Sequence, residues 1–186
     1  MKKIFALMLA IMMLIAAAAF AEDIPSKDPS GMTGSTTDNT QQAMIWTKDC
    51  EASEKELENL KQAESIVKYF ENAQDFYGNP VVLTEMLEAE EAELNVDEFT
   101  GIFAKDFKND CGDVTATLKF ATPFEVGEKV AVMIGMTGNN GYDWTAFEGV
   151  GVNSTELGEG CVEVTLPQDM VLAIQQNSGL VAIVSK

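Results

Sequence analysis

The 186-residue sequence contains no histidine and no arginine. Without histidine, the chain has no imidazole to act as a catalytic base or as a metal ligand. Without arginine, it lacks the planar, bidentate group that clamps carboxylates and phosphates. The absence of histidine excludes Ser-His-Asp and Cys-His catalysis and every imidazole metal site.

Positive charge is also scarce, because twelve lysines face thirty acidic residues and the formal net charge is −18 at pH 7. Such a chain repels nucleic-acid backbones and anionic lipid surfaces, so we expect no nucleic-acid partner. The expected partner is a protein or glycan that is basic rather than acidic.

Residues 1–21 predict a cleaved signal peptide. Two lysines precede an uncharged apolar run over residues 4–20, and Ala19-Phe20-Ala21 has the small-x-small pattern of a cleavage site. A run of about seventeen residues is short for a membrane span, which disfavours the alternative of an uncleaved anchor. We therefore expect a secreted, extracellular protein, free or at the cell surface, with no stable membrane insertion after cleavage.

Only three cysteines are present, Cys50, Cys111 and Cys161. An odd number allows at most one internal disulfide and leaves one thiol over. Cys111 lies just before one predicted strand and Cys161 begins another, so this pair is the first choice. Three free thiols are the alternative.

The composition divides the remaining chain into three parts. Residues 22–49 are polar and predict a flexible linker, in which Ile45 and Trp46 either dock on the domain or stay exposed. Residues 50–93 predict two helices, the first beginning near Ser53 with a capping box to Glu56, and the second at Asn79-Pro80. We expect the apolar stripes of both helices to be packing faces.

Residues 94–186 predict a β domain. The segment 114–120 alternates apolar and polar residues, whereas 129–136 is uniformly apolar, as in a central strand covered on both faces. Asn140-Gly141 predicts a hairpin turn, and Pro167 precedes a short helix over 168–177 before a last strand over 180–184. The fold class is therefore α+β, mainly β: a helical segment followed by an antiparallel β-sandwich of five or six strands, with a partial barrel as the alternative.

Four segments of this half, residues 113–124, 127–130, 144–149 and 162–167, carry a resemblance to a known type of module. They resemble small Ig-like modules of secreted proteins from Gram-positive gut bacteria, over residues 94–186. The resemblance implies an Ig-like β-sandwich and no particular reaction. The Cys-Trp-Cys spacing of antibody-type domains is absent.

The loop before the first strand of that domain is a candidate calcium site. It brings together Asp106, Asn109, Asp110 and Asp113, which offer the hard oxygen ligands that calcium prefers. Lys108 occupies a ligand position of an EF-hand, so that motif is excluded. Turn-forming preferences of Asp and Asn are the alternative explanation.

Tyr142 and Trp144 are the candidate ligand-binding residues. Alternation places both side chains on one face of their strand, so both line a surface or both enter the core. A surface position would suit stacking on a sugar, and a core position for Trp144 is the favoured alternative.

A pair of acids is the remaining source of chemistry, since glycosidases use two carboxylates across a cleft. Glu148 and Glu163, both on predicted strands, are the best candidates. We expect, however, a non-catalytic interaction module that binds a protein or glycan at the cell surface. The alternatives are a small carboxylate-dependent hydrolase or inhibitor, and a structural component of the cell envelope.

Overall fold

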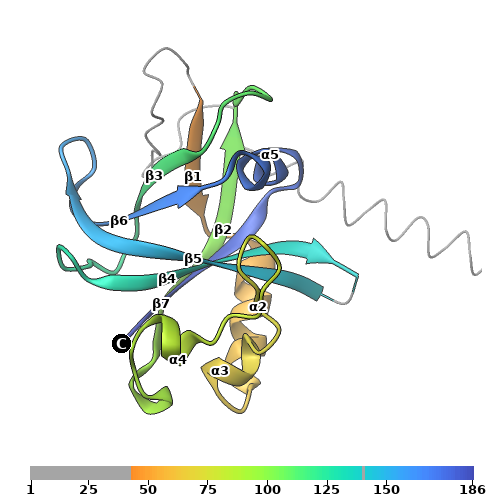
Figure 1. The fold of residues 1–186 in the computed structure, drawn as a ribbon, viewed down its shortest axis with the longest axis vertical. Helices are drawn as coiled ribbons and strands as arrows, with labels where there is room; N and C mark the ends of the chain where they lie inside the picture. Colours follow the sequence, from red (N-terminus) through yellow and green to blue (C-terminus); the bar gives the residue numbers. More distant parts are fainter. Residues whose placement is uncertain (1–42, 140) are drawn as a thin grey trace, which may run out of the picture. The chain divides into compact units, whose positions relative to one another are not determined.

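The computed structural model describes residues 43–139 and 141–186, which all belong to one compact unit. The predicted signal peptide and residues 22–42 of the predicted linker lie outside the described residues. The helices and strands appear in Figure 1 in the order β1 (Met44–Lys48), α2 (Glu51–Gln62), α3 (Ile66–Tyr69), α4 (Leu83–Met86), a 3₁₀ turn η1 (Glu91–Glu93), β2 (Asn95–Lys105), β3 (Val114–Lys119), β4 (Lys129–Gly138), β5 (Gly141–Ser154), β6 (Gly158–Leu166), α5 (Gln168–Asn177) and β7 (Gly179–Ser185).

The strands form one antiparallel sheet of seven strands in the order β1-β2-β7-β4-β5-β6-β3. The edge strands β1 and β3 approach each other, so the sheet curls into a nearly closed barrel. The prediction of a mainly β, antiparallel fold is confirmed. The strands do not divide into two hydrogen-bonded sheets as the sandwich prediction required, because β7 joins the two halves: Ala182 pairs with Phe99 of β2 and with Met133 of β4.

Each face of the central strands is covered by its own apolar cluster. The inner cluster contains Met170, Val171 and Ile174 of α5 packed among residues of β2 to β7. The outer cluster contains Leu83 and residues 66–73 of the helical segment, which pack on β2, β7, β4 and β5. In Figure 1, α5 therefore lies on one side of the sheet and α2, α3 and α4 on the other. Burial on both faces explains the uniformly apolar sequence of β4, and this prediction is confirmed.

The predicted linker extends too far toward the C-terminus. Residues 44–48 are not part of a tether but form β1, in register with β2 so that Trp46 pairs with Phe103. The two rings stack with centroids 5.6 Å apart, and both side chains are buried. Burial of large apolar rings of this kind stabilises a fold by several kcal/mol (about 3–5 on truncation), and this burial fixes the strand on the sheet.

The two-helix prediction is correct only for the start of the first helix, which ends at Gln62 and is followed by the separate turn α3 where one helix as far as Gly78 was expected, and it is largely wrong for the second helix. Helix α2 begins at Glu51, two residues before the predicted start. Ser53 lies in its first turn, where its hydroxyl accepts from the backbone N–H of Cys50 and donates to the Cys50 carbonyl. After Pro80 the chain forms one α-helical turn, α4, and the 3₁₀ turn η1, in place of a continuous helix. The preceding chain instead forms a turn closed by an isolated bridge between Gln74 and Pro80, and Gln74 also bridges Thr145 of β5.

Candidate functional site

The predicted calcium loop is held by side-chain amides of α5. Gln175 accepts from the backbone N–H of Phe107 at 2.7 Å and donates to its carbonyl at 3.1 Å, while Gln168 accepts from Gly112 N–H at 3.0 Å. The four predicted ligands, Asp106, Asn109, Asp110 and Asp113, are all exposed. Across residues 43–139 and 141–186, no group of three or more Cys, Asp or Glu side chains is placed to hold a metal ion. The loop conformation is thus explained by hydrogen bonds within the chain.

The strand register separates the cysteines that were predicted to pair. Cys161 lies opposite Lys119 at one end of β3, whereas Cys111 precedes Val114 at the other end. The strand between these positions spans about 16 Å at about 3.3 Å per residue, and a disulfide needs Cα atoms within about 7 Å. All three cysteines are free thiols. Burial raises the pKa of the Cys111 thiol, and the negative charges of Asp110 and Asp113 raise it further. The Cys111–Cys161 pairing is therefore incompatible with this register.

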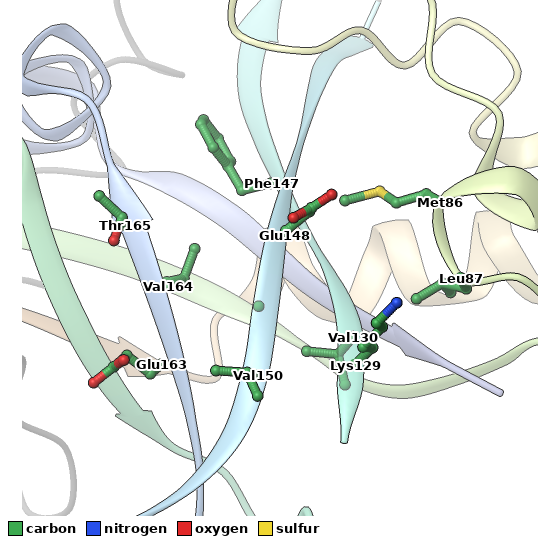
Figure 2. A pocket seen from close by; sticks show the side chains of 11 residues that line it. Met86, Leu87, Lys129, Val130, Phe147, Glu148, Val150, Glu163, Val164 and Thr165 are labelled. Carbon is green, nitrogen blue, oxygen red and sulfur yellow. The ribbon is translucent and has the colours of Figure 1, made fainter. Parts of the chain in front are cut away.

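Glu148 and Glu163 line one pocket of about 530 Å³ on the outer face of β5 and β6. Glu163 pairs with Val150, two residues beyond Glu148, so both carboxylates lie on the same face. Figure 2 shows the Glu148 carboxylate beside Met86 and the Glu163 carboxylate turned to the opposite side. The two groups do not point at a common position, as the acid pair of a glycosidase would.

Tyr142 and Trp144 also share a face, with ring centroids 6.1 Å apart. Trp144 is only 9 % exposed and contacts Phe70 and Phe99 edge to face. Its ring lies over Gly135 of the neighbouring strand, where an added Cβ would come within 2.8 Å of it. Trp144 therefore belongs to the core, which was the favoured interpretation, while the half-buried Tyr142 lies at its margin.

At this margin the helical segment and β5 form a second pocket, of about 450 Å³, which we call the aromatic pocket. Its lining combines rings with polar side chains: Glu56, Asn59, Tyr69, Asn72 and Gln74 from α2 and residues 69–74, and Tyr142, Asp143, Trp144 and Thr145 from β5. Only Tyr142 and Trp144 were predicted from the sequence. The one signal for the residues outside β5 was the i,i+3 spacing of Glu56 and Asn59 on a helix, which is too common to indicate a site.

The segment after α3 is held in place by β5. The backbone N–H of Gln74 donates to the carbonyl of Trp144 at 3.0 Å, and the N–H of Ala146 donates to the carbonyl of Gln74 at 2.8 Å. At residues 144–146, β4 pairs with one edge of β5, and β6 pairs with the other edge only from Gly149 onward. The bonds to Gln74 occupy the edge that β6 leaves free. They fix Asn72 and Gln74 beside Trp144, so the two segments that line the aromatic pocket are hydrogen-bonded to each other.

Glu56 is the carboxylate of the aromatic pocket that other side chains orient by hydrogen bonds. Its carboxylate accepts from the hydroxyl of Tyr69 at 2.8 Å and from the amide of Asn59 at 2.9 Å. Burial raises the pKa of Tyr69, and the hydrogen bond and charge of Glu56 add to this. Burial likewise raises the pKa of Tyr142, with smaller contributions from Cys50 and Glu56. Both phenols therefore stay neutral at physiological pH and are able to donate or accept hydrogen bonds.

No protein-family model, curated protein or solved structure matches this chain. No helix within residues 43–139 and 141–186 is long and apolar enough to cross a membrane. The case for a function consequently depends on the chemistry of the pockets described above.

Proposed function

We propose that this protein is an exported, non-catalytic binding module whose aromatic pocket binds a glycan at the cell surface. The observation that carries the proposal is the composition of this pocket. Tyr69 and Tyr142 provide partly exposed rings, and the amides of Asn59, Asn72 and Gln74 provide donors and acceptors for hydroxyl groups.

The size of the pocket favours a glycan over a folded protein as the ligand. About 450 Å³ falls within the range of pockets that enclose small ligands, and this volume suits a short stretch of sugar units. Stable protein–protein interfaces, in contrast, bury about 800 Å² on each partner over broad surfaces. The rigid attachment of residues 72–74 to β5 also means that little ordering is needed on binding.

The experiment is a screen of the full chain against a broad glycan panel, followed by titration of each glycan that binds. Tyr142→Ala should lower affinity at least about tenfold, because it removes a ring at the margin of the pocket. Tyr77→Ala is the matched control, since Tyr77 is 86 % exposed and does not line the pocket. The proposal is overturned if no glycan binds, or if both variants bind as the unchanged chain does.

The same panel tests the hydrolase alternative. Release of shorter products from any glycan would favour an enzyme, and the Glu148→Gln and Glu163→Gln variants would show whether the carboxylates of the pocket on β5 and β6 carry the reaction. The turned-apart arrangement of these groups in Figure 2 leads us to expect binding without turnover.

A further inference from the structure

Glu56 is a carboxylate that forms no ion pair with any lysine of the part of the chain that the structure describes. Ion pairs within residues 43–139 and 141–186 join Lys61 to Glu58, Lys68 to Glu71 and Lys129 to Glu88, so none includes Glu56. The side chain is half-buried, and its two oxygens are oriented by Tyr69 and Asn59. Each oxygen keeps capacity for a further donor.

The neighbours of this carboxylate also attract cations. Trp144 has its ring centroid 6.1 Å from the ring of Tyr69 and 6.1 Å from that of Tyr142. The faces of such rings carry a partial negative charge, and groups of aromatic rings are a recurrent way to bind ammonium groups. The net charge of −18 adds a negative field over the whole molecule, which draws cationic ligands toward the pocket.

We propose that the glycan carries a free, protonated amino group, whose ammonium binds between the Glu56 carboxylate and the rings of Tyr69 and Tyr142. The ligand class is thus an amino sugar that is not N-acylated, in a chain whose hydroxyl groups contact Asn72 and Gln74. This inference rests on the proposed function, because it names the chemical class of ligand for the same pocket.

Three oligosaccharides of equal length and β-1,4 linkage isolate the amino group: oligomers of glucosamine, of N-acetylglucosamine and of glucose. They differ only in carrying an ammonium, an acetamide or a hydroxyl at carbon 2. Calorimetric titration of the full chain should give about tenfold tighter binding of the glucosamine oligomer, as one favourable contact of the ammonium predicts. Added sodium chloride should reduce this preference, because salt screens the charge interaction.

Glu56→Gln removes the charge but keeps the shape and the acceptor for Tyr69, so this variant should fold normally and bind all three oligomers alike. Glu54→Gln is the matched control, because Glu54 is exposed on the same helix, does not line the pocket and undergoes the same change of charge. The control variant should keep the tenfold preference.

The outcomes separate this inference from the proposed function. Equal affinity for the three oligomers, or a preference that persists in Glu56→Gln, overturns the amine inference and leaves glycan binding in place. Failure of every oligomer and of the whole panel overturns both. Tighter binding of an oligolysine peptide than of the glucosamine oligomer, lost in Glu56→Gln, assigns the ammonium to a protein ligand and overturns the choice of a glycan.

Discussion

The side-chain amide of Gln175 hydrogen-bonds to both backbone groups of Phe107, a residue 68 positions earlier in the chain. It replaces the partner that a neighbouring strand would provide, just where β2 ends and the chain leaves the sheet. Helix α5 therefore does more than fill the inner cluster. It also determines the path of the loop that leads to β3.

Replacement of this amide should destabilise the fold. We expect Gln175→Ala to lower the free energy of unfolding by about 1–3 kcal/mol, since two partly buried hydrogen bonds are lost and both backbone groups of Phe107 lose their partner. Denaturant unfolding measures the change. Gln176→Ala, on the exposed side of the same helix, should change stability by no more than about 0.5 kcal/mol.

Calcium should have no effect on the stability of the loop 106–113. Its backbone is held by Gln168 and Gln175, and the acidic residues in it are exposed. We expect the same melting temperature in millimolar calcium as in a chelator, and the same rate of proteolysis at this loop. A higher melting temperature in calcium that disappears in Asp110→Asn would contradict this expectation and restore the cation site.

Gly135 should tolerate no side chain. A Cβ at this position meets the ring of Trp144 at 2.8 Å, and the ring is confined by Phe70 and Phe99. We expect Gly135→Ala to cost about 1–3 kcal/mol of unfolding free energy through overpacking. The same substitution should cost less in a Trp144→Phe background, where the smaller ring leaves room. Additive effects of the two substitutions would show that the close approach carries no strain.

Tyr69 should make stability depend on alkaline pH. Burial and Glu56 raise its pKa in the folded chain above the ordinary value of 10.0. The neutral phenol is thus favoured by folding, and this stabilisation is complete below pH 10.0 and declines as the pH rises further, since the unfolded phenol ionises first.

The free energy of unfolding should consequently fall as the pH rises above 10.0 toward the raised pKa of the folded chain. It should fall less steeply in Tyr69→Phe, which has nothing to ionise at this position. Denaturant unfolding of both forms over this range measures the difference, because the contributions of Tyr142 and the lysines are common to both. Parallel curves would show that the phenol of Tyr69 is not perturbed.

Local periodicity was sufficient to predict most of the β half. The alternation of residues 114–119 and the apolar run of 129–136 each record which faces of a strand are buried, and the structure confirms both. Pro167 and Gly179 mark the limits of α5, whose bounds match the prediction. These features depend on residues that are close together in the chain, so they can be predicted from a single sequence.

The features that were missed depend on distant partners. Trp46 is buried because it meets Phe103 across β1 and β2, and five residues at the end of a polar segment give no period from which to predict a strand. The aromatic pocket has the same origin, because Glu56, Tyr69 and Tyr142 come from three separate segments. In the sequence, its polar residues cannot be distinguished from ordinary exposed residues of a helical segment. Only the position of β5 beside them shows that they line a pocket.

The central position of β7 has a consequence for biogenesis. Residues 179–185 form the strand between β2 and β4, so they separate β1 and β2 from the other four strands. During synthesis, these two parts of the sheet cannot be joined until residues 179–185 have been made. Their joining is a late, non-local step, and each half exposes unpaired edges until then. Deletion of β7 should therefore yield not a smaller barrel but a chain whose two half-sheets stay unjoined and whose exposed edges cause aggregation during expression.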